Sequence, residues 1–333
     1  MQLSDLIKEY IVDCKSRRLA TKTIAWYEAN LRYFTEWLAQ QDIGDDLAAF
    51  TLRNARAYSA VLADRVATKG TFVSTGAKRG VHALRETDQP LAANTVIGYL
   101  RTLKVFSKWL AAEEQGYLPA HVLAGLRLPR KPKIFKEALT STELESLLGE
   151  FDLGKPIDMR DFAILLTYSA TGLRATELTD LLLDDIRYEE GYLRVRSGKG
   201  SKTRVVNLPP EVGRAMLRYR LHYRPATQDP YLFVTRYGVK MTYNAIKLVL
   251  RRARHKSGIA RLHAHLLRRT FGANALDDGM DLMTLKDTFG HEDIRTTALY
   301  LEQSERRVIA NQRKANPLAG VTLPKAVRPK PKR

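Results

Sequence analysis

A short basic segment near the middle of the chain is the feature that most limits how this sequence can fold. Residues 127–136, RLPRKPKIFK, include five basic residues, two prolines and no acidic residue. Proline disfavours a helix and the charges keep the segment in water, so it is the best candidate for an interdomain linker. A chain of 333 residues has room for two domains of about 100–200 residues each. The sequence therefore predicts one domain at 1–126 and another at 137–318.

The first predicted domain is a small helical bundle. Apolar residues recur at helical spacing in three runs, which are Leu3, Leu6, Ile7, Tyr10, Ile11 and Cys14, then Ile24, Tyr27, Leu31, Phe34 and Leu38, then Ile97, Leu100, Leu103, Phe106 and Leu110. Residues 51–66 are expected to form one more helix. Between the helices, residues 68–90 contain three glycines and no sustained period, so we expect a long loop there, which a ligand could order.

The second predicted domain is helical with a small antiparallel sheet. Helical patterns resume at LTSTELESLL, whereas in residues 191–209, GYLRVRSGKGSKTRVVNLP, β-branched residues flank a glycine-rich turn and predict a hairpin. Residues 319–333 are basic and rich in proline, which predicts a disordered tail with an electrostatic role. The expected fold class is therefore mainly α with a small antiparallel sheet.

The charge of the chain points to a polyanionic partner. Lys and Arg number 55 against 36 Asp and Glu, which gives a net charge of +19, and self-repulsion of that size opposes compaction unless an anion offsets it. No apolar run approaches the ~18–20 residues of a membrane span, and no strongly basic amphipathic helix has an aromatic face. Nucleic acid is therefore favoured over a membrane. A basic protein without such a partner is the ordinary alternative.

The N-terminus and the cysteine content favour a cytoplasmic protein. The segment MQLSDLIKEY has early acidic residues and lacks the apolar core of a secretory signal. Cys14 is the only cysteine, so no intrachain disulfide can form, as suits a reducing cytosol.

Several polar residues occur at spacings that ordinary structure does not require. Arg174 precedes Glu177 by three residues, Lys199 lies between two glycines at the expected hairpin tip, and His265 and Arg268 share a helix face. Taken singly, each has an ordinary explanation as a surface ion pair, a solvated lysine or a solvated helix face. Only the whole set indicates a functional site.

His291 and Tyr300 can meet only if the helix between them is interrupted. In one continuous helix they would be about 13 Å apart along the axis and on nearly opposite faces. Gly290 follows the helical run DLMTLKDTF and is well placed to end that helix. We therefore expect His291 in a turn and Tyr300 close to the end of the next short helix, with both side chains near one point.

In this order and spacing, the segments TGLRATEL, GKGSKTRVVNLP, HAHLLRRTFGANAL and GHEDIRTTALY, spread over 171–300, make the sequence similar to the tyrosine recombinases, the phage integrase and Xer-like site-specific DNA recombinases. The resemblance extends, without a sharp motif, to the N-terminal helices, which are similar to the family's SAM-like core-binding domain. It implies a C-shaped clamp of two domains around DNA.

The resemblance implies roles for six catalytic residues, and the chemistry of a phosphodiester agrees with them. Arg174 and Arg268 would bind the non-bridging phosphate oxygens, where negative charge builds up. Tyr300 would attack the phosphorus and form a 3′-phosphotyrosyl bond. That bond stores the energy of the cut strand, so no metal, ATP or other cofactor is expected.

The remaining roles concern protons and orientation. His265 resembles the general base or proton shuttle, and His291 would hydrogen-bond the phosphate. Lys199 resembles the general acid that protonates the departing 5′ oxygen, with Lys202 as the second candidate. Glu177 resembles the acidic partner that orients Arg174.

Some positions depart from the family's pattern. Arg269 stands where the family often has a second histidine, and Ala264 stands where proline is frequent. His263 lies two residues from His265 and could point away from the site. These differences leave the six catalytic-type residues in place.

The expected partner is double-stranded DNA carrying specific recombination sites, bound by a homotetramer that exchanges strands through a Holliday junction. Candidate DNA contacts are basic residues of the linker, the hairpin and the helix expected at 242–258, namely Lys131, Lys133, Lys202, Arg251, Arg252, Arg254 and Lys256. For that helix, a solvated basic face is the equal alternative. Because core-binding helices begin almost at residue 1, we expect a recombinase without an additional arm-binding domain.

Three other functions fit parts of the pattern. A type IB topoisomerase uses the same residue set, although the segment after Tyr300 suits a recombinase better. A DNA-binding architectural or repressor protein would explain the charge but leave the catalytic-type residues unexplained. A zinc enzyme could use His263, His265 and His291 as ligands, but neighbouring arginines would repel the cation.

Overall fold

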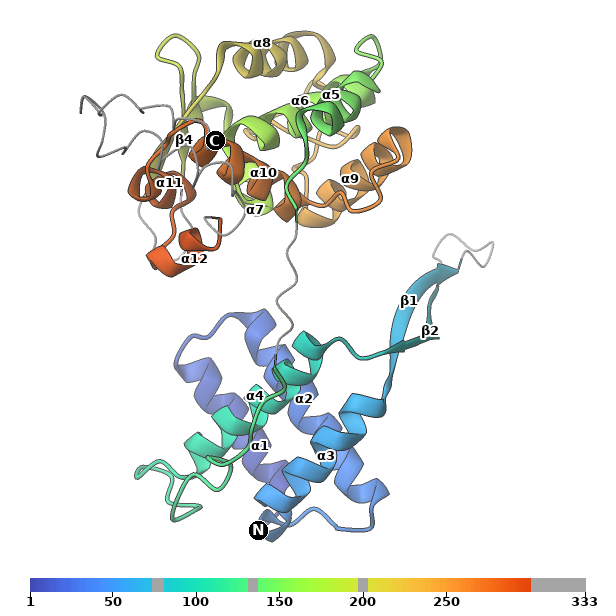
Figure 1. The fold of residues 1–333 in the computed structure, drawn as a ribbon, viewed down its shortest axis with the longest axis vertical. Helices are drawn as coiled ribbons and strands as arrows, with labels where there is room; N and C mark the ends of the chain where they lie inside the picture. The colour runs from blue at the N-terminus through green and yellow to red at the C-terminus, as the bar shows by residue number, and fades with distance from the viewer. Residues whose placement is uncertain (74–80, 131–136, 197–202, 301–333) are drawn as a thin grey trace, which may run out of the picture. The chain divides into compact units, whose positions relative to one another are not determined.

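The computed structural model describes residues 1–73, 81–130, 137–196 and 203–300, and for 66–73 and 81–89 it describes the backbone alone (Figure 1). The chain divides into two compact units, Met1–Ile134 and Phe135–Arg333. In the described part, no helix is long and apolar enough to cross a membrane. The predicted tail at 319–333 lies outside the described residues.

The first unit is a helical bundle around an aromatic core. Its helices are α1 (Leu3–Ser16), α2 (Thr21–Gln40), α3 (Leu52–Asp64) and α4 (Ala93–Leu110), with a short 3-10 turn at Leu47–Ala49 (Figure 1). Tyr10, Phe34 and Phe106 are almost fully buried, and the ring centroids of Tyr10 and Phe106 lie 5.3 Å apart. Cys14 is buried on the same face of α1. The helical periodicity of the sequence is confirmed here.

The predicted loop at 68–90 is wrong. Strands β1 (Val66–Val73) and β2 (Val81–Pro90) pair as an antiparallel ribbon, with an irregularity between Val66 and Thr68. The pairing satisfies the backbone hydrogen bonds within the ribbon itself, so it needs no apolar alternation in the sequence. Glycine content alone was therefore a poor guide in this segment.

The second unit is mainly helical, with one small sheet. Its helices are α5 (Ser141–Gly149), α6 (Pro156–Thr171), α7 (Ala175–Thr179), α8 (Pro210–Arg218), α9 (Tyr243–Ser257), α10 (Ala264–Asp277), α11 (Leu282–Phe289) and α12 (Ile294–Ala298), with a 3-10 turn at Leu183–Asp185 and a π-helical turn at Tyr219–Tyr223. Strands β3 (Ile186–Arg187), β4 (Tyr192–Val195) and β5 (Arg204–Asn207) form an antiparallel sheet in that order. The predicted fold class and the predicted hairpin are both confirmed.

Helix α6 runs through the core of this unit and ends beside the functional residues. It packs against α8 and α10, and its buried Thr167 and Thr171 donate to carbonyls four residues earlier, which removes the cost of burying their hydroxyls. Gly172 ends the helix with a φ of 60°. A Cβ there would lie 2.6 Å from the rings of Phe271 and Phe289, so both the backbone angle and the packing require glycine. Arg174 follows two residues later, immediately before α7.

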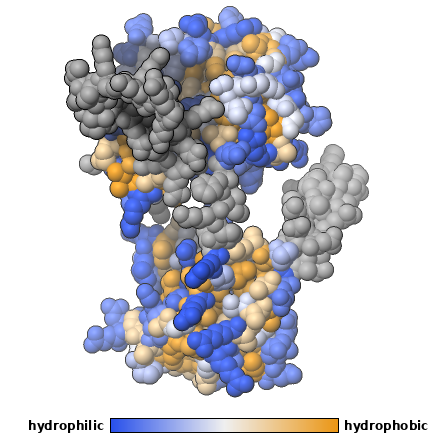
Figure 2. Space-filling model, in the orientation of Figure 1, coloured by the Kyte–Doolittle hydropathy of each residue, from blue (hydrophilic) through white to orange (hydrophobic). Residues whose placement is uncertain are grey.

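The surface in view is a mixture of hydrophilic residues and scattered apolar ones in both units (Figure 2). Trp26 on α2, for example, is 45% exposed. Scattered exposed apolar residues are normal for a folded protein and do not by themselves define a site.

Candidate active site

The first cation of the site lies at the start of α7. Arg174 precedes this helix, and Glu177 one turn later accepts hydrogen bonds from its backbone nitrogen at 2.7 Å and from its Nη1 at 2.8 Å. The pair predicted from the i, i+3 spacing is thus present. The Nη2 of Arg174 reaches further and donates to the carbonyl of Gly290 at 3.1 Å. This side chain is 40% exposed, so it can also meet a ligand from solvent.

A second arginine, from the sheet, binds the same carboxylate. Arg204 begins β5, and its Nη1 and Nη2 donate to the two oxygens of Glu177 at 2.9 and 2.8 Å. Its Nε donates to the carbonyl of Thr288 at 2.7 Å. Arg204 carries no local signal in the sequence, because it lies 27 positions from Glu177 and no short-range spacing links the two.

Helix α10 supplies a third arginine, which is buried. Arg268 is 4% exposed, and it donates to the carbonyls of Gly172 and Phe289 at 2.7 and 2.9 Å. Its Nη2 lies 3.0 Å from Nε2 of His291, and its guanidinium carbon stands 4.0 Å from the centre of the Phe289 ring. These contacts fix the plane and direction of the guanidinium group.

The turn after α11 has the geometry that the sequence predicted. Gly290 ends the helix in the left-handed region with a φ of 59°, and His291 follows in the turn before α12. The Nδ1 of His291 lies 2.9 Å from Oγ1 of Thr297. Thr297 is fully buried, so this contact holds the imidazole ring against α12.

Tyr300 lies just beyond the end of α12, as expected. Its backbone nitrogen donates to the carbonyl of Thr297 at 3.0 Å, its side chain is buried, and its ring centroid lies 5.2 Å from that of Phe289. The His291 ring also lies 5.2 Å from Phe289. The interrupted helix therefore brings His291 and Tyr300 against the same aromatic ring.

The electrostatics of the cluster show an excess of positive charge. Burial and, after it, the charge of Arg174 lower the pKa of Arg268 to about 10, although Tyr300 and Glu177 oppose this shift. Burial together with the charges of Arg268, Arg174 and Arg204 lowers the pKa of His291 to about 4. His291 is therefore neutral at pH 7. Cations held this close to one another favour an anionic ligand.

Glu177 is the carboxylate that offsets part of this charge. Burial by itself would raise the pKa of Glu177, but hydrogen bonds from Arg204 and from the backbone and side chain of Arg174 outweigh it and lower the pKa to about 2. Glu177 therefore stays ionised between Arg174 and Arg204, and its charge also acts on Arg268.

His265 lies on the same helix as Arg268. It is exposed on the first turn of α10, and its charge contributes to the lowered pKa of His291, so it is near the cluster. His263, by contrast, is exposed and places its Nδ1 2.6 Å from the carbonyl of Arg261. In the described ranges, no three His, Cys, Asp or Glu side chains form a group that could hold a metal.

Four of the basic residues predicted from the sequence lie outside the described residues, namely Lys131, Lys133, Lys199 and Lys202. The remaining predicted DNA contacts lie on α9. Arg252 donates through Nε to Asp161 at 2.8 Å, Arg254 donates to the carbonyl of Leu262 at 2.7 Å, and Lys256 contacts Asp158 at 2.6 Å. Arg251 is exposed. Part of the basic face of α9 is thus used for contacts within the unit.

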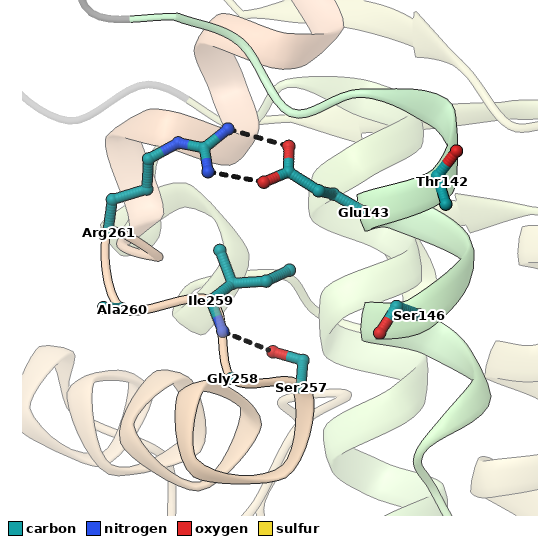
Figure 3. Close-up of a pocket in the computed structure, with 8 residues that line it drawn as sticks. All are labelled: Thr142, Glu143, Ser146, Ser257, Gly258, Ile259, Ala260 and Arg261. Atoms are coloured by element: carbon teal, nitrogen blue, oxygen red, sulfur yellow. Dashed lines mark hydrogen bonds and ion pairs between the residues drawn. The ribbon is translucent and has the colours of Figure 1, made fainter.

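An open pocket of about 480 Å³ lies elsewhere on this unit, between α5 and the end of α9 (Figure 3). Glu143 and Arg261 form a double ion pair across it, with one contact of 2.7 Å, and the remaining lining is mostly small or hydroxyl-bearing side chains. None of the clustered arginines, His291 or Tyr300 lines this pocket. The pocket is therefore separate from the cation cluster, which remains the candidate site.

Comparison with known proteins places this geometry in a family. The phage integrase family matches residues 137–307. The tyrosine recombinase XerD of Lacticaseibacillus casei is 30% identical over 237 residues, which cover 70% of this chain and 79% of that protein. The tyrosine recombinase XerD of Listeria monocytogenes serotype 4b (strain F2365) is 26% identical over 92% of this chain and 96% of its own length.

Solved structures share the fold. The Tn1549 transposon integrase in complex with a circular intermediate DNA has a TM-score of 0.71 and 18% identity, over 94% of this chain and 99% of that one. A lambda integrase dimer bound to a COC′ core site has a TM-score of 0.68 and 15% identity, over 92% and 97%. At these identities the similarity concerns the fold alone.

This mainly helical chain with a small antiparallel sheet, in which Tyr300 and Arg268 both pack against Phe289, shares the fold of these integrases. The match over half of the chain and the 30% identical relative then identify it. The chain belongs to the phage integrase family, and it is a tyrosine recombinase. The resemblance noted from the four sequence segments is confirmed.

Proposed function

We propose that this protein is a site-specific recombinase that cuts and rejoins duplex DNA through a covalent bond between Tyr300 and a 3′ phosphate. The observation that carries the proposal is the cluster in which Arg174, Arg268 and His291 gather around the Phe289–Tyr300 contact with an excess of positive charge. A phosphodiester is an anion that gains further negative charge when it is attacked, so it matches this cluster.

In the proposed reaction, Arg174 and Arg268 bind the non-bridging oxygens of the scissile phosphate. Both guanidinium groups are held by backbone carbonyls, so little reorganisation is needed as charge develops. His291 is neutral, and Nδ1 lies beside Thr297. Nε2 lies 3.0 Å from Nη2 of Arg268, which can only donate, so Nε2 accepts that hydrogen bond here. When a phosphate oxygen takes up the Arg268 donor and the ring's hydrogen moves to Nε2, His291 would donate to the phosphate.

The covalent step exchanges one phosphoester bond for another. The phenol oxygen of Tyr300 attacks the phosphorus, and its proton passes to His265, while the bond to the 5′ oxygen breaks. Lys199 gives its proton to that oxygen, with Lys202 as the second candidate. The 5′ hydroxyl of a partner strand then attacks the phosphotyrosyl bond and reverses the sequence. The number of phosphoester bonds is the same before and after each step, so the reaction needs no external energy source.

Strand exchange between two sites requires more than one active site. We propose that four copies assemble on two DNA sites and pass through a Holliday junction. The Tn1549 transposon integrase, which shares the fold and was solved in complex with a circular intermediate DNA, supports DNA as the partner. In this proposal residues 1–126 and 137–318 grip opposite faces of the duplex, with the basic linker 127–136 against phosphates. The enzyme would act on DNA in the cytoplasm.

The test compares the unaltered protein with Tyr300→Phe on DNA fragments that flank its own coding region. Each mixture is divided between a native gel, which reports binding, and a denaturing gel, which reports covalent attachment. We expect both proteins to shift the DNA, and only the unaltered protein to leave a band that survives denaturation. Binding without a covalent band from either protein would support an architectural role and contradict the proposal.

A second assay separates the recombinase from a type IB topoisomerase. Supercoiled plasmid with one site and plasmid with two sites are incubated with the protein. We expect recombinant products from the two-site plasmid. Relaxation of both plasmids without recombinants would support the topoisomerase instead, and a single bound protein per paired site at saturation would contradict the tetramer.

A further inference from the structure

Arg204 contacts two parts of the cluster but has no role in the proposed reaction. It binds both oxygens of Glu177 on α7, and through Nε it binds the carbonyl of Thr288 near the end of α11. These two segments supply Arg174 and His291. Arg204 is thus one side chain from the sheet that joins the two helical segments of the site.

The directions of its donors exclude a direct role at the phosphate. Nε, Nη1 and Nη2 each point at a protein oxygen, and the side chain is only 11% exposed. A buried bidentate contact of this kind is geometrically specific, because both partners are planar. Arg174 differs, since its side chain is 40% exposed and only one of its hydrogen bonds to Glu177 comes from the guanidinium.

Gly290 shows how closely Arg204 packs on the turn that carries His291. A Cβ at Gly290 would lie 3.1 Å from Nη1 of Arg204 and 3.4 Å from its Cδ and Cζ. The carbonyl of the same glycine accepts the hydrogen bond from Arg174. One residue, Gly290, therefore lies between the two arginines, and a shift of Arg204 would move the base of the His291 turn.

We infer that Arg204 is a positioning residue, which holds Glu177 and the Gly290 turn so that Arg174 and His291 face the scissile phosphate in one fixed geometry. The inference rests on the proposed function, since it assigns Arg204 a role in that same reaction. Arg204 acts through its neighbours and does not touch the DNA.

The charge of Glu177 provides a readout that a purely structural role would not affect. Glu177 faces Arg174 on its own segment, Arg204 from β5, Arg268 from α10 and Tyr168 from α6. Hydrogen bonds from Arg204 are the largest influence that keeps its pKa low, and burial acts in the opposite direction. Without Arg204, we expect the pKa of Glu177 to rise. A smaller fraction of the enzyme then has an ionised Glu177 as the solution becomes acidic.

The experiment measures single-turnover formation of the covalent complex on a nicked duplex between pH 5 and 8. It uses the full chain and the variants Arg204→Gln, Arg204→Lys, Glu177→Gln and the Glu177→Gln Arg204→Gln pair. The matched control is Arg261→Gln, because Arg261 also makes a double contact with a glutamate and donates to a carbonyl, but away from the cluster (Figure 3). Native gels and thermal unfolding report DNA affinity and folding.

We expect Arg204→Gln to slow covalent attachment about 100-fold, since a small displacement of positioned groups has an effect of this size, while DNA affinity changes only a few-fold. Its rate should fall further toward pH 5, and the doubly substituted protein should lack this acid dependence. Arg204→Lys should recover part of the rate, because it retains the charge but not the planar fork.

Two results would overturn the inference. One is an Arg204→Gln rate that matches Arg261→Gln across the pH range. The other, which decides the matter if the Gln variant does not fold, is an Arg204→Lys rate equal to that of the unaltered protein. A lack of covalent product from the unaltered protein is a separate outcome, because it contradicts the proposed function itself and the role of Arg204 with it.

Discussion

Two carboxylates in the second unit, the buried Asp161 and the mostly buried Glu177, are each bound by two arginines, yet their surroundings differ. Asp161 on α6 accepts from Arg160 at 2.9 Å and from Arg252 on α9 at 2.8 Å. Glu177 accepts from Arg174 at 2.8 Å and from Arg204 at 2.9 Å. Judged by residue types alone, the two networks look alike.

The difference is the amount of positive charge that the carboxylate leaves unbalanced. Around Asp161, Arg160 is buried and its remaining contact is with the carbonyl of Val234, so the group ties together parts of the core. Around Glu177, the third arginine, Arg268, adds a buried charge. A buried ion network can therefore serve the fold or a ligand, and the excess charge distinguishes the two.

The largest effect on folding is expected from Asp161→Ala. This change leaves Arg160 and Arg252 without their carboxylate, and breaking a buried pair from one side costs about 3–5 kcal/mol. Urea unfolding measures the loss. Covalent attachment to DNA per folded molecule should stay close to that of the unaltered protein. A strong loss of attachment at full folding would mean that the Asp161 network also serves the site.

The largest effect on chemistry is expected from Arg268→Lys. A lysine cannot reproduce the contacts with Gly172, Phe289 and His291, so we expect covalent attachment to slow by about 100- to 1000-fold, the range for a lost transition-state donor. The free energy of unfolding should change by less than it does for Asp161→Ala. Equal losses in both assays would remove the contrast between the networks.

Gly172→Ala should lower the stability of the second unit and also slow the reaction at the site. The substitution forces a left-handed angle on alanine and places a Cβ against Phe271 and Phe289. Strain and overpacking together cost on the order of 2–4 kcal/mol. Thermal unfolding and the covalent assay should both show a loss, because the Gly172 carbonyl also holds Arg268. Gly149→Ala is the control, since its φ is not positive and nothing lies near its Cβ.

His291 should give the fold an acid-sensitive component. Its pKa is lowered to about 4 in the folded protein, against about 6.5 in an unfolded chain. Between these values the unfolded chain binds a proton that the folded protein does not, so stability is present above pH 6.5 and falls as the pH drops toward 4. His291→Gln should flatten this fall in thermal unfolding, whereas His263→Gln, at an exposed position, should leave it unchanged.

The smallest effects are expected on the surface of α9. Arg251 is exposed, so if this face contacts phosphates, Arg251→Gln should weaken DNA binding several-fold and reduce the salt slope by about one. Lys256 is already held by Asp158 and by the carbonyl of Glu150, so Lys256→Gln should change the slope less. Equal slopes for the two variants would favour the alternative of a solvated basic face.

Elements that depend on short-range spacing could be predicted from the amino-acid sequence. Apolar periodicity identified the helices, β-branched residues around a glycine turn identified the hairpin at 191–209, and Gly290 located the break between His291 and Tyr300. The Arg174–Glu177 pair followed from residues three apart on one helical turn. In each case the geometry of a few consecutive residues decides the contact.

Contacts between residues far apart in the sequence could be found only from the folded structure. The pairing of β1 with β2 and the contacts of Arg204 with Glu177 and Thr288 depend on how whole elements pack. The same holds for Asp161 and Arg252, which are 91 residues apart. No local pattern encodes such contacts, because they arise from the burial of the surrounding apolar faces. Local spacing could therefore pair Arg174 with Glu177, but it could not pair Arg204 with the same carboxylate.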